Sequence, residues 1–234
     1  MSSVIDFHSH ILPGIDDGSR SLEESIAMLR MEAEQGITHV VATPHFYARH
    51  DSPERFLERR NEAENRLREE MEKYPGLPEL TVGAEVYYFP GISESDAVFQ
   101  LTIGGKSSIL LEMAYSPWTD RMYAEMEDIY VKQGITPVIA HVDRYISPFR
   151  THGIPDRLSQ LPVLVQANGS FFLERGTRNM ALRMLKAGRI HLLGSDCHNL
   201  DSRRPNLGET VQVIRKRLGP EALERIRKYE TEIL

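Results

Sequence analysis

The segment Val4-Ile5-Asp6-Phe7-His8-Ser9-His10 opens the chain with a largely apolar run that ends in two histidines at positions i and i+2. A matching segment near the other end reads His191-Leu192-Leu193-Gly194-Ser195-Asp196-Cys197-His198. Residues two apart in a β-strand project from the same face, so each segment would present two ligand-type side chains together. The two segments therefore predict strands that each carry part of one metal centre.

Other ligand-type residues follow apolar runs between these two segments. They come at the ends of four further runs, at His45, Glu85, Glu112 and His141. We predict strands at 4–8, 38–43, 80–86, 108–112, 136–141, 163–167 and 190–194. Most of these runs are apolar throughout, as expected for a parallel sheet that is covered on both faces. The sixth run ends in Gln166-Ala167-Asn168-Gly169 and offers no obvious ligand.

Helix-like segments separate the strands. Ser21 and Glu24 have the spacing of a capping box, and Gly36 ends the helix that they begin. Ser52-Pro53 starts a second helix, which Tyr74-Pro75-Gly76 ends. Further helices are predicted over 118–133, 179–187, 208–218 and 220–229. Seven strand and helix units predict an α/β barrel in a single domain, residues 1–234, with its catalytic groups at the carboxyl ends of the strands.

Composition narrows the class of protein. The chain has 234 residues, of which 41% are hydrophobic and 26% charged, as in a globular domain with a substantial core. The net charge of -6 argues against a nucleic-acid binder, which needs clustered Lys and Arg. No apolar run approaches about 18 residues, so we expect no membrane insertion. The single cysteine, Cys197, fits a reducing compartment, and we expect the protein in the cytoplasm.

The strand-end residues carry weight as a set, because a lone buried His or Glu is more often a hydrogen-bonded core residue than a ligand. Eight such residues at six strand ends favour a metal centre: His8, His10, His45, Glu85, Glu112, His141, Asp196 and His198. The other histidines precede strand ends or lie in polar loops, and we assign them structural or surface roles. They are His39, His50, His152 and His191.

The chain resembles a known superfamily at these positions. The motifs are His8-Ser9-His10-Ile11-Leu12-Pro13-Gly14-Ile15-Asp16-Asp17-Gly18, Thr43-Pro44-His45, Gly83-Ala84-Glu85, His141-Val142-Asp143-Arg144 and Ser195-Asp196-Cys197-His198-Asn199-Leu200. They are similar to motifs of the PHP (polymerase and histidinol phosphatase) superfamily, and most closely to bacterial manganese-dependent protein-tyrosine phosphatases of capsule and exopolysaccharide operons. The resemblance covers nearly the whole chain. It implies the PHP fold, a distorted seven-stranded TIM-like barrel that holds three metal ions.

The resemblance also implies a ligand set. One ion would be held by His8, His10, Glu85 and Asp196, a second by Glu85, Glu112 and His141, and the third by Asp17, His45 and His198. The residues alone do not choose Asp17 over Asp16, nor do they place the bridging ligand at Glu85 rather than Glu112. Mixed imidazole and carboxylate ligands suit Mn²⁺, Fe²⁺ or Zn²⁺ better than Mg²⁺ or Ca²⁺, and Mn²⁺ is the first choice.

Two arginines follow the ligands closely. In the family, arginines at the positions of Arg144 and Arg203 bind phosphate, which makes them candidate catalytic and substrate-binding residues. Without the resemblance, a surface ion pair would be the simpler interpretation of each. Bound divalent ions would lower the pKa of a shared water, and the resulting hydroxide would displace the phosphate ester in line without a covalent intermediate.

Aromatic residues follow several of the ligands and would suit the ring of phosphotyrosine, although loop packing explains any one of them equally well. They are Phe46-Tyr47, Tyr87-Tyr88-Phe89, Tyr115 with Trp118, and Tyr145 with Phe149. We therefore expect a metal-dependent protein-tyrosine phosphatase. Its expected substrate is a bacterial tyrosine kinase that controls polysaccharide synthesis and export. The alternatives are a small-molecule phosphatase of the same superfamily, such as a histidinol-phosphate phosphatase, and a non-enzymatic metal-binding regulator.

A cysteine-dependent mechanism is a further alternative, because Cys197 and Arg203 have the Cys-x5-Arg spacing of another class of tyrosine phosphatases. The segment between them, His198-Asn199-Leu200-Asp201-Ser202, has no glycine to turn backbone N–H groups toward a phosphate. Cys197 also lies between two ligands at a strand end, so its side chain should face away from them. We expect this cysteine to be inert.

Overall fold

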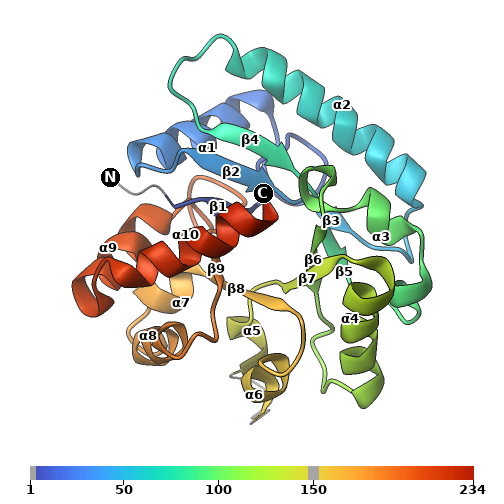
Figure 1. Cartoon of the computed structure of the whole chain (residues 1–234). Coiled ribbons are helices and arrows are strands. Elements are labelled where there is room, and N and C mark those ends of the chain that lie inside the picture. The colour runs from blue at the N-terminus through green and yellow to red at the C-terminus, as the bar shows by residue number, and fades with distance from the viewer. Residues whose placement is uncertain (1–3, 147–152) are drawn as a thin grey trace.

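Parallel β-strands run through the centre of the molecule, and helices cover them on the outside (Figure 1). The computed structural model describes residues 4–146 and 153–234. Its strands are β1 (Asp6–Ser9), β2 (His39–Ala42), β3 (His45–Phe46), β4 (Glu79–Val82), β5 (Glu85–Tyr87), β6 (Ser108–Glu112), β7 (Thr136–Ile139), β8 (Leu164–Asn168) and β9 (Leu192–Gly194). The prediction of an α/β fold with parallel strands is confirmed.

The helices alternate with these strands along the chain. They are α1 (Leu22–Glu34), α2 (Pro53–Met71), α3 (Ala97–Gln100), α4 (Asp120–Gln133), α5 (Asp143–Ile146), α6 (Ile154–Leu158), α7 (Gly169–Leu173), α8 (Arg178–Lys186), α9 (Leu207–Leu218) and α10 (Glu221–Ile233), with two 3-10 turns, η1 (Ile92–Glu94) and η2 (Ile103–Gly105). The six longer helices correspond to the predicted ones. The helices α3, α5, α6 and α7 were not predicted, because a helix of four or five residues is too short to show an apolar period.

The helix starts at Ser21 and Ser52 are confirmed. The Ser21 hydroxyl accepts a hydrogen bond from the Glu24 N–H at 3.3 Å, and the Glu24 carboxylate accepts one from the Arg20 N–H at 2.8 Å. Ser52 caps α2 in the same way, with Pro53 in the first turn. None of the helices in the described ranges is long and apolar enough to pass through a bilayer.

The strands form two sheets. β1, β2 and β4 make a three-stranded sheet, and β3, β5, β6, β7, β8 and β9 make a six-stranded sheet that curls around it (Figure 1). Two runs predicted as single strands, 38–43 and 80–86, are each divided between the two sheets. The structure therefore has nine strands in its described part where the sequence predicted seven.

The two breaks lie side by side. Pro44 separates β2 from β3 and has no N–H to donate to a neighbouring strand. Gly83 separates β4 from β5, and a Cβ at this position would lie 2.9 Å from the nearest side chain. Hydrogen bonding continues across the breaks, because the Gly83 N–H donates to the Ala42 carbonyl (2.9 Å) and the Glu85 N–H donates to the Pro44 carbonyl (3.0 Å). Each run thus continues in direction while it changes sheets.

The first and last strands meet at their carboxyl ends. The Asp196 N–H donates to the His8 carbonyl at 2.8 Å, and the His10 N–H donates to the Cys197 carbonyl at 2.9 Å. Gly194 permits this approach, since a Cβ there would lie 2.5 Å from the Cβ of His8. The two ligand-bearing segments from opposite ends of the sequence are therefore neighbours in space.

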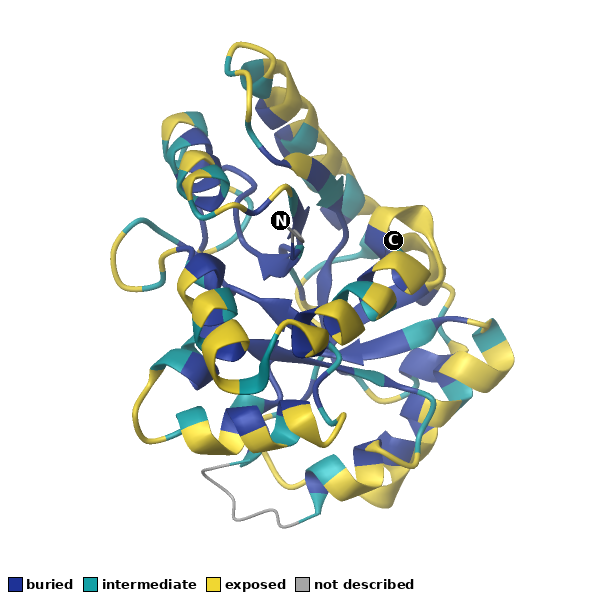
Figure 2. Cartoon of the chain, turned by 60° about the vertical axis from the view of Figure 1, so that its left-hand side comes forward, coloured by how far each residue is buried: buried dark blue, intermediate teal, exposed yellow. Residues whose placement is uncertain are grey.

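A shared apolar interior lies between the two sheets. It is lined by Phe7 of β1, Val41 of β2, Leu110 of β6, Val138 of β7 and Leu192 of β9, all of which are fully buried. A larger apolar layer lies between the strands and the surrounding helices, whose outer faces are exposed (Figure 2). Because strands from both sheets pack into one interior, the carboxyl ends of all of them open on the same side.

Candidate metal centre

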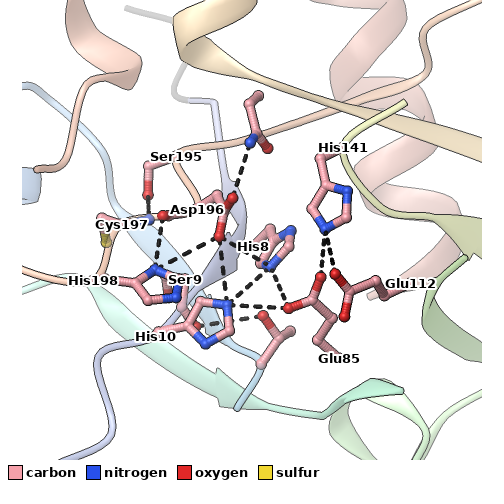
Figure 3. Close-up of polar contacts among 12 residues, drawn as sticks. His8, Ser9, His10, Glu85, Glu112, His141, Ser195, Asp196, Cys197 and His198 are labelled. Atoms are coloured by element: carbon pink, nitrogen blue, oxygen red, sulfur yellow. Dashed lines mark hydrogen bonds and ion pairs between the residues drawn. The ribbon is translucent and has the colours of Figure 1, made fainter. Parts of the chain in front are cut away.

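The nine side chains predicted as ligands lie together at the carboxyl ends of the strands. They are His8 and His10 at the end of β1, Asp17 before α1, His45 on β3, Glu85 on β5, Glu112 on β6, His141 after β7, and Asp196 and His198 after β9. Each belongs to a group of three or four residues whose donor atoms lie within 4.8 Å of one another. Figure 3 shows most of these side chains converging on Glu85 and Asp196.

The two histidines of β1 face two acidic side chains. The Nε2 atoms of His8 and His10 are 3.1 Å apart. Both lie near Oε2 of Glu85, at 3.3 and 3.2 Å, and near Oδ1 of Asp196, at 3.6 and 3.5 Å. All four side chains are buried. The first predicted ligand group is therefore assembled in the structure.

Glu85 lies at the centre of the cluster. Its Oε1 is 2.6 Å from Nε2 of His141, and its Oε2 is 3.0 Å from Nδ1 of His45. Glu112 lies farther out, with oxygens 3.7 Å from Nε2 of His141 and 3.9 Å from Nδ1 of His45. Glu85 thus contacts the histidines of β1 as well as those that Glu112 approaches.

Asp16 and Asp17, which the sequence did not distinguish, occupy different positions. Oδ1 of Asp17 lies 3.5 Å from Nε2 of both His45 and His198. Asp16 lies behind His10, whose Nδ1 is 2.8 Å from Oδ2 of Asp16, and it also accepts a hydrogen bond from the His45 N–H at 3.1 Å. Asp17 therefore faces the other ligand candidates, whereas Asp16 fixes the orientation of the His10 ring.

The end of β8 supplies supporting amides that the sequence analysis missed. Gln166 Oε1 accepts a hydrogen bond from the His141 N–H at 2.6 Å and lies 3.2 Å from Nδ1 of His8. The Asn168 amide donates to Oδ2 of Asp196 at 2.9 Å. Gln166 and Asn168 are two residues apart at a strand end, as the ligand pairs are. This spacing is the signal that could have identified them.

Two of the ligand candidates have strained backbones. Within the described ranges, the non-glycine residues with positive φ are His141, at 32°, and Asp196, at 53°. Such conformations cost roughly 1–3 kcal/mol and persist where surrounding contacts fix them, which is typical of functional sites.

Burial and charge act in opposite directions on these groups. Burial raises the pKa of a carboxyl group, but His8, His10 and His141 hold the pKa of Glu85 well below its ordinary value. Burial also disfavours the charged form of His10, yet the neighbouring carboxylates raise the pKa of His10 to about 10. Burial and the charge of His10 lower the pKa of His198 to about 4. His198 is therefore neutral at physiological pH and offers a free lone pair, as a metal ligand must.

The donor set fits divalent transition-metal ions. In the described part of the chain, five buried atoms of the candidate ligands make no hydrogen bond of good geometry: Nδ1 of His45, Oε2 of Glu85, Oε2 of Glu112, Nδ1 of His141 and Nε2 of His198. The first two lie 3.0 Å apart as an ion pair. Buried polar atoms rarely stay unpaired, so these atoms mark positions for a further partner. Imidazole nitrogens and carboxylate oxygens in one cluster suit Mn²⁺, Fe²⁺ or Zn²⁺. The residues present therefore fit a group of such ions.

Arg144 and Arg203 lie at the edge of the same cluster. Both guanidinium groups pair with Asp196: Nη2 of Arg203 lies 2.7 Å from Oδ1, and Arg144 pairs with Oδ2. The side chains are 36% and 38% exposed, so each also faces solvent. Asn199 orders the loop that carries Arg203, because its Oδ1 accepts a hydrogen bond from the Arg203 N–H at 3.1 Å. Both arginines are placed to hold an anion beside Asp196.

Two hollows flank the ligand cluster. One, with a volume of 400 Å³, is lined by Asp17, His45 and Tyr47. The other, with a volume of 480 Å³, is lined by Arg144 and Tyr115. The cluster therefore lies between two spaces that are open to a ligand.

The described aromatic residues predicted near the mouth divide into three groups, and Tyr87, Phe89 and Trp118 form the half-buried one. Tyr47 and Tyr115 are exposed and line the hollows, whereas Phe46, Tyr88 and Tyr145 are buried. The buried rings pack the loops onto the strands, as the simpler interpretation expected. Phe149 and His152 lie outside the described residues.

His39, His191 and Cys197 are not among the ligand candidates, whereas His50 lines the hollow beside Asp17 and His45. His39 Nε2 lies 2.7 Å from Oγ1 of Thr81, and His191 Nδ1 accepts a hydrogen bond from the Val165 N–H at 3.0 Å. Cys197 is fully buried, and burial raises the pKa of its thiol well above the ordinary value. A cysteine-dependent mechanism needs an accessible thiolate, which this position does not provide.

Comparisons with known proteins point to the same kind of site. The chain matches the family described as capsular polysaccharide synthesis, CpsB/CapC, over residues 4–234. It is 30% identical over 228 residues to the tyrosine-protein phosphatase CpsB of Streptococcus pneumoniae, covering 92% of this chain and 91% of that protein. It is also 30% identical over 232 residues to the tyrosine-protein phosphatase YwqE of Bacillus subtilis (strain 168), covering 93% and 86%.

A solved structure shares the fold. It comes from work on YwqE from Bacillus subtilis and CpsB from Streptococcus pneumoniae, described there as unique metal-dependent tyrosine phosphatases. The superposition has a TM-score of 0.86 at 24% identity and covers 99% of this chain and 94% of that one. The arrangement of strands and helices is therefore common to both.

Proposed function

This chain belongs to the capsular polysaccharide synthesis family CpsB/CapC, and on that premise we propose that it is a metal-dependent protein-tyrosine phosphatase, a phosphoric monoester hydrolase. The observation that carries the proposal is the convergence of imidazole and carboxylate groups with two arginines at one site. Relatives named tyrosine-protein phosphatases match nearly the whole chain, which favours this activity over that of a histidinol-phosphate phosphatase.

The proposal includes three divalent ions, with Mn²⁺ as the first choice. Their ligands would be His8, His10, Glu85 and Asp196 for the first, Glu85, Glu112 and His141 for the second, and Asp17, His45 and His198 for the third. The short distances within each group support this assignment, and the position of Glu85 among four histidines supports it as the bridging ligand. When bound, such ions supply a water of lowered pKa and neutralise phosphate oxygens.

Arg144 and Arg203 would bind the substrate phosphate. A guanidinium group can pair with two phosphate oxygens at once and stabilises negative charge that develops during displacement. Both guanidinium groups pair with Asp196 and are partly exposed to solvent. When they turn to the substrate, the hydrogen bond from the Asn168 amide would keep Asp196 in place. Their role is therefore to orient the phosphoryl group over the ligand cluster.

The hollow beside Asp17 and His45 would take the aromatic ring of the substrate. Tyr47 lines this hollow and is 36% exposed, so it can pack against a phosphotyrosine ring. The phenolate of tyrosine also leaves more readily than a serine alkoxide, so the reaction depends less on a general acid.

The physiological substrate would be a bacterial tyrosine kinase that controls polysaccharide synthesis and export. The family description, capsular polysaccharide synthesis, supports the link to polysaccharide. We propose that the reaction takes place in the cytoplasm, because a reducing compartment is consistent with a single free cysteine. We propose neither nucleic acid nor an inserted membrane as a partner. We also infer that the two sheets act as one distorted seven-unit barrel in a single catalytic domain, which the hydrogen bonds between the ends of β1 and β9 support.

The test compares three substrates with the Mn²⁺-loaded protein: a phosphotyrosyl peptide, the same peptide with phosphoserine, and histidinol phosphate. We expect kcat/KM for phosphotyrosine to be at least about tenfold above the others, equivalent to about 1.4 kcal/mol. Comparable turnover of phosphoserine would contradict the proposal. A preference for histidinol phosphate would favour the small-molecule phosphatase, and metal binding without any turnover would favour the regulator.

A further inference from the structure

A second buried polar cluster lies directly behind the candidate metal centre. It consists of Asp6 on β1, Glu32 on α1 and Cys197 after β9, and their donor atoms lie within 4.8 Å of one another. The exposed fraction of each residue is 0%. None of the three is among the proposed ligands, and the proposed reaction does not use them. Their position calls for a separate explanation.

Asp6 holds the turn that presents Asp196. Its Oδ1 accepts hydrogen bonds from the Ser195 N–H at 2.8 Å and from the His8 N–H at 3.2 Å, and its Oδ2 accepts one from the Ser195 hydroxyl at 2.5 Å. The Ser195 hydroxyl oxygen in turn accepts a hydrogen bond from the Cys197 N–H at 3.1 Å. Figure 3 shows Ser195 and Cys197 close together, with the Asp196 carboxylate directed away from them toward His8 and His10. One carboxylate therefore ties the ends of β1 and β9 together immediately behind the ligands.

This clamp acts on a strained residue. Asp196 has a φ of 53°, which a residue with a side chain keeps only where its neighbours fix it. Asp6 fixes Ser195 directly, and through the Ser195 hydroxyl it also fixes Cys197. If the clamp loosened, Asp196 would relax and its carboxylate would turn away from His8 and His10.

Glu32 reaches Asp6 from the side of α1. One carboxyl oxygen of Glu32 and one of Asp6 lie within 4.8 Å of each other, and neither oxygen of Glu32 has a hydrogen-bond partner in the described part of the chain. Two buried carboxylates in contact repel each other unless they share one proton. With that proton on Glu32, Glu32 donates to Asp6, which stays an anionic acceptor for Ser195. Burial, together with the charge of Asp6, raises the pKa of Glu32 well above its ordinary value, and burial also raises the pKa of Asp6, so the pair as a whole favours one bound proton.

We propose that Glu32 is a positioning residue for the metal centre, which acts through Asp6 and Ser195 to fix the direction of the Asp196 carboxylate. The inference rests on the metal centre of the proposed function. A buried polar pair is a poor source of stability, because well-packed apolar side chains of similar volume serve as well or better. A role at the site, rather than in the stability of α1, therefore accounts for Glu32.

The test separates site from stability with three variants. Glu32→Leu removes the hydrogen bond to Asp6 and keeps the volume, Glu32→Gln keeps a donor to Asp6, and Glu34→Leu changes an exposed residue of the same helix as a control. The Mn²⁺ affinity of each metal-free chain is measured by titration calorimetry, and its unfolding temperature is measured without metal. We expect Glu32→Leu to weaken Mn²⁺ binding by about tenfold or more, as supporting partners of metal ligands commonly do. Its unfolding temperature should stay the same or rise. Glu32→Gln and Glu34→Leu should bind Mn²⁺ like the wild type.

Several outcomes would overturn the inference. Equal Mn²⁺ affinity in Glu32→Leu and the wild type would do so, as would parallel losses of affinity and stability that Glu32→Gln does not rescue. An additional bound ion that the Cys197→Ser variant loses would show that the cluster is itself a metal site. If the wild-type chain bound no Mn²⁺ at all, the proposed function would fail and the positioning role with it, whereas normal binding and turnover in all variants would remove only the role of Glu32.

Discussion

Glu85 and Glu230 are both buried glutamates, with exposed fractions of 1% and 2%, yet their surroundings drive them to opposite charge states. The histidines around Glu85 hold its pKa well below the ordinary value. Glu230, on α10, accepts a hydrogen bond from the Ile5 N–H at 3.1 Å, but burial raises its pKa to about 8. Burial thus favours the neutral acid at Glu230, whereas the surrounding histidines keep Glu85 ionised.

The same strand connects the two glutamates. Ile5 immediately precedes β1 and His8 lies toward its carboxyl end, so the contrast is between the two ends of one strand. Ionised histidine and carboxylate groups lie together at the carboxyl end of β1. At its amino end, the buried neutral acid Glu230 stabilises the packing of α10. A strongly perturbed pKa therefore marks function only where opposite charges surround the group.

Removing divalent ions should have the largest effect, because it acts only at the Glu85 end. Dialysis against a chelator should reduce phosphotyrosine hydrolysis to background, and added Mn²⁺ should restore it. The Cys197→Ser variant should keep most of its activity, since the thiol faces away from the ligands. Full activity after chelation, or loss of activity in Cys197→Ser, would show that the reaction does not depend on metal ions bound around Glu85.

Matched amide substitutions should separate the two glutamates directly. Glu85→Gln should lower kcat/KM roughly a thousandfold or more, because loss of a shared ligand removes several kcal/mol of charge stabilisation and each 1.4 kcal/mol is a factor of ten. Glu230→Gln should leave kcat/KM unchanged. Steady-state kinetics and the metal content of both variants test this prediction. Equal losses of kcat/KM in the two variants would show that the burial of a glutamate, rather than its role as a ligand, determines the activity.

Truncation of the arginines should have a smaller effect. Arg144→Ala and Arg203→Ala should each lower kcat/KM by about a hundredfold, as loss of one preorganised donor to a developing anion does. Lysine at either position keeps the charge without the bidentate geometry and should fall between. Arg66→Ala, at an exposed position on α2, serves as the control. Unchanged kinetics in both alanine variants would leave the phosphate without its proposed partners.

The smallest expected effect is on stability at the Glu230 end. Its pKa is about 8 in the folded protein and 4.5 ordinarily, so only the unfolded chain loses this proton as the pH rises between these values. The stabilising contribution of neutral Glu230 is therefore complete below pH 4.5 and is lost as the pH rises toward 8. Glu230→Gln removes this loss. Its unfolding temperature in chelator should exceed that of the wild type by an amount that grows from pH 5 to 8, to roughly 10 °C. A constant difference would contradict the assignment.

The position of most ligand candidates could be predicted from sequence because their signal is local. An apolar run followed by ligand types two apart, as at His8 and His10, indicates both the strand and its exposed end. The separation of Asp17 from Asp16 could not be predicted, since both lie in one loop and only the approach of His10 and His198 distinguishes them.

Other features depend on contacts between distant segments. The breaks at Pro44 and Gly83 divide two runs because neighbouring strands change sheets there together, which no single run reveals. Glu32 lies on a helix rich in glutamate, and in the sequence it resembles any residue of a solvated face. Its burial follows only from the packing of α1 over Asp6.

The hydrogen bonds that join His8 to Asp196 and His10 to Cys197 connect two segments that are synthesised at opposite ends of translation. The ribosome releases His8 and His10 early, but their acidic partner Asp196 emerges only after all the intervening strands have been synthesised. On the proposed ligand set, a nascent or prematurely terminated polypeptide without the segment after β9 would lack Asp196 and His198 and would bind cations weakly. Tight cation binding would thus be restricted to polypeptides that have been synthesised past His198.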